Sequence, residues 1–207
     1  MMVSALIERE LSSAAFPIRD GVFVAVVGPS GAGKDTIIDY ARTRFADESR
    51  LDFVRRVITR PSDAGSEDHD TLAEAAFIEA EVDGAFAVSW EAHGLRYGIP
   101  ADVDWSVANG RVAVANVSRA IVPVLRERYA NLAVVEITAS PEILAERLAM
   151  RGRESRGEVL ARLARSATLS GPGVTSIDNG GPRELAGERF VEVLRKAMAF
   201  SDISGQI

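Results

Sequence analysis

The sequence of 207 residues contains no cysteine, only two histidines and only two lysines among its 24 basic residues. Without cysteine the chain forms neither disulfides nor thiolate metal sites, and it has no cysteine nucleophile. No apolar run approaches the ~20 residues that a membrane-spanning helix needs. The stretch from Met1 to Glu10 alternates apolar and charged residues and lacks a signal-peptide core. We therefore expect a soluble, cytoplasmic protein without a membrane partner.

The net charge of −6 at pH 7 disfavours nucleic acid as the main partner. This charge is unevenly distributed, because residues 147–165 contain six arginines and only two glutamates, a local net charge of +4. A basic segment inside an acidic protein suits a small polyanionic ligand. Apolar segments are evenly spaced and no Pro/Gly/Ser-rich linker divides the chain, so we expect one domain over residues 1–207, as a monomer or a homodimer.

The most informative stretch lies between the apolar run from Val22 to Val27 and a segment with helical apolar spacing. It fills the phosphate-binding pattern G-x-x-x-x-G-K, whose glycines let several backbone N–H groups converge on one anion. The following helix start adds free N–H groups and the positive end of a dipole. An ordinary glycine-rich turn is the alternative, but a chain that uses arginine almost everywhere keeps lysine here, where a compact ammonium is useful. The predicted phosphate-binding residues are Gly28, Pro29, Ser30, Gly31, Ala32, Gly33, Lys34, Asp35 and Thr36.

The rest of the chain alternates strand and helix patterns, which predicts an α/β fold with a parallel sheet. The residues from Val112 to Ala115 form a fully apolar run, as expected of a central parallel strand. We expect a loop over residues 62–71 and a turn or hairpin over residues 93–98. The expected strands are residues 22–27, 51–59, 86–90, 112–115, 132–138 and 175–177. The expected helices are residues 5–11, 33–44, 73–80, 101–108, 118–129, 141–150, 158–168 and 183–199.

Two further segments carry polar and aromatic side chains where a second substrate would sit, beyond the carboxyl ends of the strands. Arg60 could hold an acceptor phosphate bidentately, and Tyr97 could add a hydroxyl donor. The alternatives are plain: Arg60 as a surface arginine, the histidines as loop residues, and Trp90 as packing at a strand end. The candidates are Arg60, Glu67, Asp68, His69, Trp90, His93, Arg96 and Tyr97.

The arginine-rich segment offers candidates for neutralising a transferring phosphoryl group, whose charge spreads over its equatorial oxygens. Arg147 and Arg151 are four residues apart, on one helix face. A solvated arginine-rich surface is the alternative. The candidates are Arg147, Arg151, Arg153, Arg162 and Arg165.

From Val22 onward the chain resembles the guanylate-kinase-like group of P-loop kinases. Within that group it is most similar to the ribose 1,5-bisphosphate phosphokinase family of the carbon–phosphorus lyase pathway for phosphonate degradation. The residues that carry the closer similarity are Gly33-Lys34-Asp35, Ile58-Thr59-Arg60-Pro61, Ala64-Gly65-Ser66-Glu67, Ser89-Trp90, Gly94-Leu95-Arg96-Tyr97-Gly98 and Arg151-Gly152-Arg153-Glu154.

This resemblance implies a three-layer α/β/α P-loop kinase fold, an acceptor-binding segment at about residues 60–100 and a lid at about residues 147–165. It also implies an ATP- and Mg²⁺-dependent enzyme that converts ribose 1,5-bisphosphate to 5-phosphoribosyl 1-diphosphate. Lys34 and the lid arginines Arg147, Arg151 and Arg153 would be catalytic. Glu67, His69, Trp90, Asn116 and Arg162 would join Arg60 and Tyr97 around the sugar phosphate, and Asn179 would lie near adenine.

The chain departs from guanylate kinases at positions that read guanine. Ile99 and Pro100 follow Tyr97-Gly98, where a guanylate kinase offers a hydroxyl residue, and Asn116 stands where it has an acidic residue. A site that loses polar partners for a base loses much of its discrimination for that base. We therefore expect Arg60 to hold a sugar phosphate and not a nucleotide.

Asp35 occupies the position after the lysine, where P-loop enzymes usually have Ser or Thr for Mg²⁺. Because Asn116 is neutral, we expect Asp35 to supply the carboxylate for Mg²⁺, through water. A favourable interaction of Asp35 with the helix dipole alone is the alternative. Two other functions stay open at this point: a guanylate or other nucleoside monophosphate kinase, and a non-catalytic module with the same fold.

Overall fold

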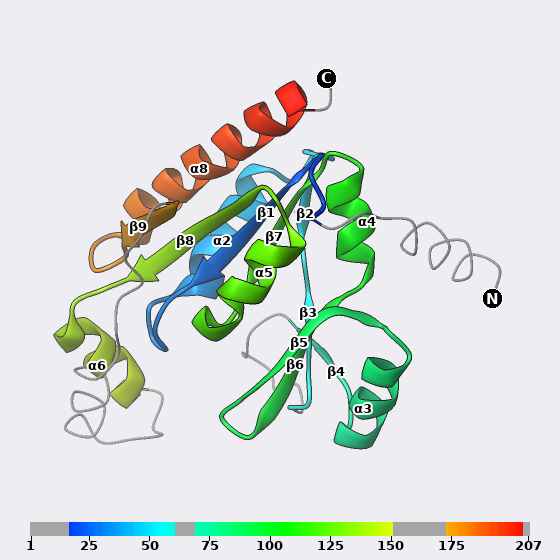
Figure 1. Ribbon diagram of the computed structural model, residues 1–207. Coiled ribbons are helices and arrows are strands. Elements are labelled where there is room, and N and C mark those ends of the chain that lie inside the picture. Colours follow the sequence, from blue (N-terminus) through cyan, green and yellow to red (C-terminus); the bar gives the residue numbers. More distant parts are fainter. Residues whose placement is uncertain (1–16, 61–68, 151–172, 205–207) are drawn as a thin grey trace.

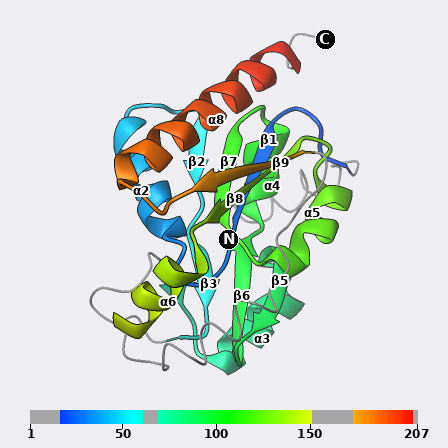
Figure 2. The same ribbon diagram turned by 90° about the vertical axis from the view of Figure 1, so that its left-hand side faces the viewer.

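The computed structural model describes residues 17–60, 69–150 and 173–204 (Figure 1). These residues form two sheets, one of five strands and one of four. In both Figure 1 and Figure 2 the long helix α8 lies at one end of the molecule and the smaller sheet, with α3, at the other.

The strands are β1 (Val22–Val27), β2 (Leu51–Phe53), β3 (Arg56–Ile58), β4 (His69–Thr71), β5 (Phe86–Ala92), β6 (Leu95–Pro100), β7 (Val112–Asn116), β8 (Leu132–Thr138) and β9 (Val174–Asp178). The helices are α2 (Lys34–Arg44), α3 (Glu74–Val82), α4 (Asp102–Ala108), the short 3₁₀ helix η1 (Arg119–Ile121), α5 (Val122–Arg128), α6 (Pro141–Met150) and α8 (Arg183–Ser204).

The five-stranded sheet is parallel throughout, with the strand order β2-β7-β1-β8-β9. Its central strand β1 is buried at all six positions, because helices cover both faces. Alternate residues of β1 enter two different cores: Val24 packs with α2 and α8, and Phe23 packs with α4 and α5. Burial on both faces explains why β1 and β7 read as continuous apolar runs in the sequence. Since all strands are parallel, their carboxyl ends meet at one edge, where the loop after β1 lies.

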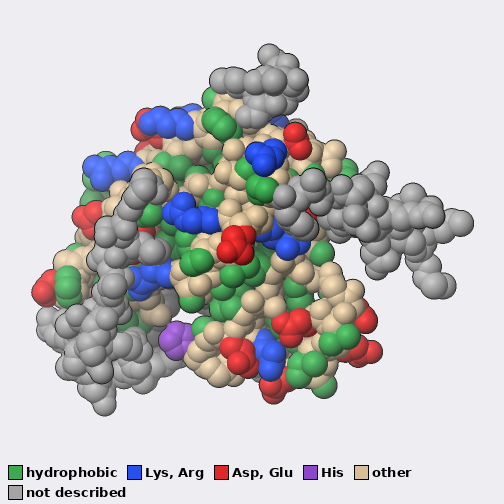
Figure 3. Space-filling view, in the orientation of Figure 1, with side chains coloured by type: hydrophobic (Ala, Val, Ile, Leu, Met, Phe, Trp, Pro, Cys, Tyr) green, Lys and Arg blue, Asp and Glu red, His purple; other side chains and the backbone are tan. Residues whose placement is uncertain are grey.

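The four-stranded sheet has the order β4-β3-β6-β5 and is antiparallel except for the β3–β4 pair. One of its faces is covered by α3, where Phe77 stacks on Phe86 with ring centroids 4.5 Å apart. On this face Ser89 donates a hydrogen bond to Glu81, and Arg96 lies 3.6–3.7 Å from the carboxylates of Glu74 and Glu81. Figure 3 shows that the charged side chains over the lower part of the surface are mostly acidic. Because α3 occupies this face, only the opposite face of the smaller sheet can contribute side chains to a binding site.

A buried polar network joins α4 to the end of α5. The carboxylate of Asp104 accepts hydrogen bonds from Nε of Arg128 at 2.9 Å and from the hydroxyl of Tyr129 at 2.7 Å. The Tyr129 ring stacks on Phe23 of β1 at 4.6 Å between centroids. Burial, with the Asp104 carboxylate beside it, raises the pKa of Tyr129 well above its usual range. The network therefore fixes α4 and α5 against the central strand by charge-assisted hydrogen bonds as well as by apolar packing.

The α/β class and the parallel sheet are confirmed, and most expected elements are present with small shifts at their ends. The expected strand over residues 51–59 is wrong as one element, because the chain pairs with β7 at Leu51–Phe53 and changes to the smaller sheet at Arg56–Ile58. The expected loop over residues 62–71 is wrong at its end, since His69–Thr71 pairs with β3. The helix expected over residues 118–129 divides into η1 and α5, with Ser118 capping the first. The helices expected over residues 5–11 and 158–168 lie outside the described residues.

Among the described helices, none is both long enough and apolar enough to span a bilayer.

The Asp104 network predicts a large stability effect. Asp104→Ala should lower the free energy of unfolding by about 2–3 kcal/mol, because it leaves a half-buried guanidinium and a buried hydroxyl without their acceptor. The matched control is Glu192→Ala, which removes an exposed i,i+4 pair with Lys196 and should cost less than about 0.5 kcal/mol. Urea unfolding followed by circular dichroism measures both. Equal losses in the two variants would contradict the structural role of Asp104.

Candidate phosphate-binding and acceptor site

The loop after β1 has the backbone geometry of a phosphate cradle. Gly28, Gly31 and Gly33 have φ values of 144°, 85° and 83°, a region that disfavours residues with a Cβ. A Cβ on Gly28 would lie 2.1 Å from the carbonyl oxygen of Ile137 in β8. One on Gly33 would lie 2.5 Å from Nδ2 of Asn179. The glycines are thus required both by backbone conformation and by close neighbours, as the sequence predicts.

Lys34 is the first residue of α2, and Gly33 precedes it in the left-handed region. The Lys34 ammonium donates hydrogen bonds to the carbonyl oxygens of Gly28 at 3.0 Å and of Pro29 at 3.1 Å. These contacts hold the ammonium across the loop, beside the free N–H groups at the start of α2. The positive charge and the helix dipole therefore act on the same small volume, where an anion would bind.

Two side chains from other parts of the chain, Asn179 and Arg147, contact the phosphate-binding loop. The buried amide of Asn179 donates through Nδ2 to the carbonyl oxygen of Ala32 at 2.8 Å. Arg147 of α6 donates to the carbonyl oxygen of Asn179 at 2.8 Å and to that of Gly31 at 3.5 Å, which is the outer limit for a hydrogen bond. The structure therefore brings Arg147 and Asn179 to the loop itself. An adenine contact for Asn179 stays a prediction.

Asp35, the second residue of α2, makes contacts across the site. Nδ2 of Asn116, at the carboxyl end of β7, donates to Oδ1 of Asp35 at 2.7 Å. The same oxygen lies 3.8 Å from Nη2 of Arg56, the first residue of β3. The sequence predicts both Asp35 and Asn116 at the site, and the hydrogen bond shows that they lie next to each other. Arg56 was not among the sequence candidates.

Three side chains line the face of the smaller sheet that is not covered by α3. Trp90 of β5 and Tyr97 of β6 stand opposite each other and stack, with centroids 5.3 Å apart and an angle of 8° between planes. The guanidinium carbon of Arg56 lies 6.0 Å from the centroid of the Tyr97 ring. Trp90 also packs against the core that includes residues of α4 and α5. It therefore contributes to packing and also lies beside the candidate site. By contrast, Arg96 lies on the α3 face and His93 in the exposed hairpin turn.

The backbone of Arg60 is held by the neighbouring strand β4. The hydroxyl of Thr71 donates to the carbonyl oxygen of Arg60 at 3.0 Å, and Nε2 of His69 lies 3.4 Å from the same oxygen. His69 is buried, so the structure gives it a contact with the main chain of Arg60. Binding of a ribose hydroxyl by His69 stays a prediction. Six other candidates lie outside the described residues: Glu67, Asp68, Arg151, Arg153, Arg162 and Arg165.

The fit of a magnesium ion rests on Asp35. Among the described residues, no group of three or more His, Cys, Asp or Glu side chains could hold a metal by themselves. Mg²⁺ in phosphate-transferring sites needs only one or two carboxylates besides phosphate oxygens and water. A single aspartate beside Lys34 is consistent with that pattern.

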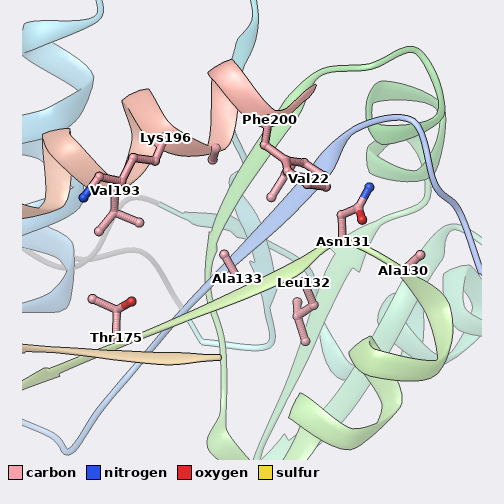
Figure 4. A pocket seen from close by; sticks show the side chains of 10 residues that line it. Val22, Ala130, Asn131, Leu132, Ala133, Thr175, Val193, Lys196 and Phe200 are labelled. Carbon is pink, nitrogen blue, oxygen red and sulfur yellow. The ribbon is translucent and has the colours of Figure 1, made fainter. Parts of the chain in front are cut away.

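A cavity of about 410 Å³ lies at the other end of the parallel sheet, between α8 and the first residues of β1 and β8 (Figure 4). Its lining is mostly apolar and contains none of the sequence candidates. The lining residues are Val22, Ala130, Asn131, Leu132, Ala133, Thr175, Val193, Lys196, Ala197 and Phe200. It is therefore separate from the phosphate-binding loop, which follows the carboxyl end of β1.

No family model matches the chain. Curated relatives do match it, and several of them, including the following three, are named ribose 1,5-bisphosphate phosphokinase PhnN. The relative from Chelativorans sp. (strain BNC1) is 54% identical over 209 residues, covering 100% of both chains. The relative from Brucella melitensis is 51% identical and covers 85% of this chain and 93% of its own. The relative from Agrobacterium fabrum is 47% identical and covers 86% of this chain and 98% of its own.

Among solved structures, a guanylate kinase from Anaplasma phagocytophilum superposes with a TM-score of 0.59 over 86% of each chain. Its sequence is only 18% identical, so this similarity shows the fold alone. It confirms the P-loop kinase fold expected from the sequence.

The geometry of the loop predicts that Gly33→Ala loses affinity for a nucleoside triphosphate by at least about tenfold, because the backbone strains and the Cβ meets the Asn179 amide. The control is Gly84→Ala, also at a positive φ (74°) but with nothing within 4 Å of the added Cβ. Calorimetric titration with ATP measures both. A Gly33→Ala protein that binds ATP as tightly as the Gly84→Ala protein would contradict this account of the loop.

Proposed function

The chain belongs to the ribose 1,5-bisphosphate phosphokinase family, and from this premise we propose that it transfers the γ-phosphoryl group of ATP to ribose 1,5-bisphosphate. An oxygen of the 1-phosphate attacks the γ-phosphorus, and the bond from that phosphorus to the β,γ-bridging oxygen breaks. The products are 5-phosphoribosyl 1-diphosphate and ADP. The observation that carries the proposal is the meeting of the two sides of the site at Asp35, which contacts both β7 and the acceptor-side residue Arg56.

The chemistry needs no general base. A phosphate monoester has a second pKa of about 6, so the attacking oxygen is already deprotonated at pH 7. The protein must instead align two anions and screen their repulsion. Lys34 and the loop N–H groups serve the donor phosphates, and Arg147 stands at the same loop. We propose that Arg151 and Arg153 complete this screening, and that Arg60, Tyr97 and Arg162 contact the acceptor.

Bound Mg²⁺ supplies charge neutralisation on the phosphate oxygens of ATP. We propose that Asp35 holds the ion through its water shell. Asn116 fixes one oxygen of the Asp35 carboxylate by hydrogen bonding and so limits the orientations that the side chain can adopt. An uncompensated carboxylate beside the phosphates would otherwise repel them.

The acidic net charge supports small anionic substrates held by local arginines over a nucleic acid partner. Both proposed substrates carry several charges and do not cross bilayers unaided, so we place the reaction in the cytoplasm.

The test of the function is a parallel assay of ATP turnover with ribose 1,5-bisphosphate, GMP, AMP and CMP. We expect kcat/KM for ribose 1,5-bisphosphate to exceed that for GMP by at least about 10²-fold, since the acidic partner for guanine is replaced by Asn116. Lys34→Ala is the inactive control, because one such charge commonly contributes about 10²–10³ in rate. Comparable turnover of GMP would make the protein a nucleoside monophosphate kinase. If the protein did not bind ATP at all, we would conclude that it is a non-catalytic module with this fold.

The role of Asp35 predicts a change in metal dependence. Asp35→Asn should raise the Mg²⁺ concentration for half-maximal rate by several-fold, about 1 kcal/mol of binding free energy, because a formal charge beside the ion is lost. Asp39→Asn, on the exposed side of the same helix, is the matched control and should leave the Mg²⁺ dependence unchanged. Calorimetry of Mg²⁺–ATP binding without acceptor gives a readout independent of turnover. An unchanged Mg²⁺ dependence together with a lower melting temperature would restrict Asp35 to a structural role at the helix start.

A further inference from the structure

Arg56, the first residue of β3, and Arg55, which precedes it, have opposite surroundings. The Arg55 side chain is 52% exposed and pairs with Asp70 of β4 at 3.1 Å. The Arg56 side chain is only 8% exposed and lies between Asp35 and the ring of Tyr97. Strand geometry explains the difference, because successive side chains point to opposite faces of a sheet. Arg56 therefore lies on the face that looks towards the phosphate-binding loop.

The register of the smaller sheet shows which side chains share that face. Ile58 of β3 pairs with Tyr97 of β6, and Tyr97 pairs with Trp90 of β5. Arg56 is two residues before Ile58 and so belongs to the same face. The row Trp90, Tyr97 and Arg56 thus presents two stacked rings and a guanidinium side by side, while the opposite face is occupied by α3.

Burial of a guanidinium is costly unless it meets a compensating charge. The nearest carboxylate oxygen of Asp35 is 3.8 Å away, beyond hydrogen-bond distance, and it already accepts a hydrogen bond from Asn116 at 2.7 Å. Asp35 thus compensates the charge of Arg56 electrostatically, without fixing the two groups in a bidentate pair. The guanidinium presents its N–H donors in a planar fork, the geometry that binds a phosphate group bidentately.

We propose that Arg56 binds the acceptor phosphate that receives the γ-phosphoryl group, namely the 1-phosphate of ribose 1,5-bisphosphate, and that Arg60 binds the 5-phosphate. This inference rests on the proposed function. Arg56 is the cation of the acceptor sheet that contacts Asp35, the residue after Lys34, so a phosphate bound there lies beside the donor site. Arg60 is four residues further along, up to about 13 Å away at about 3.3 Å per residue. Strand β3 ends at Ile58, and the N–H of Thr59 still donates to the carbonyl oxygen of Arg96 in β6 at 3.1 Å.

The presence of two arginines on the acceptor side suits the chemistry of the acceptor. A ribose with phosphates at both ends needs two anion-binding groups, one of them at the transfer point. The stacked rings of Trp90 and Tyr97 lie on the same face as Arg56 and offer a flat apolar surface for the sugar. A guanidinium at the transfer point also screens the repulsion between the incoming phosphate and the γ-phosphoryl group.

The experiment compares Arg56→Gln and Arg56→Lys with the neighbouring variant Arg55→Gln. We expect Arg56→Gln to lower kcat/KM for ribose 1,5-bisphosphate by at least about 100-fold, with less than about threefold change in the KM for ATP, because a bidentate charged contact to the acceptor is lost. Arg56→Lys should recover only part of the rate, since an ammonium lacks the planar fork. Arg55→Gln should stay within about threefold of the wild type, because its side chain lies at the exposed edge with Asp70.

Two competitors identify the phosphate concerned. Inhibition constants for ribose 1-phosphate and ribose 5-phosphate, measured against ribose 1,5-bisphosphate, should respond differently. Arg56→Gln should weaken inhibition by ribose 1-phosphate and leave that by ribose 5-phosphate, and Arg60→Gln should do the reverse. The opposite pattern, or equal losses for both competitors, would overturn the assignment.

The outcomes also separate this inference from the proposed function. If the wild type does not phosphorylate ribose 1,5-bisphosphate, the proposed function fails and the assignment of Arg56 fails with it. If the wild type does so and Arg56→Gln keeps full kcat/KM, only the inference fails. A rate loss in Arg56→Gln that is matched by a raised KM for ATP or by a lower melting temperature would also overturn it.

Discussion

The Asp35 carboxylate is the point on which the two halves of the site depend. It stands at the beginning of α2, accepts a hydrogen bond from Asn116 at the end of β7, and lies 3.8 Å from Arg56 at the beginning of β3. The helix that carries Lys34, the central sheet and the acceptor-side sheet thus meet at one charged group. A kinase for a phosphorylated acceptor must bring two anions together, and two unit charges 4 Å apart interact by about 4 kcal/mol at an effective dielectric constant of 20. Positive groups must therefore be fixed on both sides before the substrates arrive.

The donor side meets this requirement through the backbone. Gly28 abuts the carbonyl oxygen of Ile137, and the buried amide of Asn179 holds Ala32, so the loop between them has little freedom to collapse. Arg147 reaches the same loop from α6, and the Lys34 ammonium bridges two of its carbonyl oxygens. The loop is consequently organised by protein contacts, and the N–H groups at the beginning of α2 face a site already shaped for phosphate.

Local sequence patterns predicted the donor side well because strand, loop and helix follow one another within about 20 residues. The acceptor side depends on long-range pairing, which short windows do not contain. Residues 51–58 resemble one strand in the sequence, yet Leu51–Phe53 pairs with β7 and Arg56–Ile58 belongs to the smaller sheet, where it pairs with β6. His69–Thr71 is polar and short, and only its pairing with β3 makes it a strand. Arg56 escaped notice for a related reason: in an arginine-rich chain, nothing before the fold distinguishes it from the exposed Arg55.

The burial of Ile99 gives this residue a different role from the one that the sequence suggests. From the sequence, Ile99 looked like a residue at the edge of a base pocket that had lost its hydroxyl. In the structure it is fully buried and packs in the core with Val88 and Val103. The apolar side chain therefore anchors β6 and puts Tyr97, two residues earlier, on the same face as Arg56. The polar surroundings of this face are the hydrogen bond from Asn116 to Asp35 and the buried Arg56 beside Tyr97. A phosphate offers a guanidinium two charged oxygens for bidentate hydrogen bonds, whereas a neutral base offers it no charge.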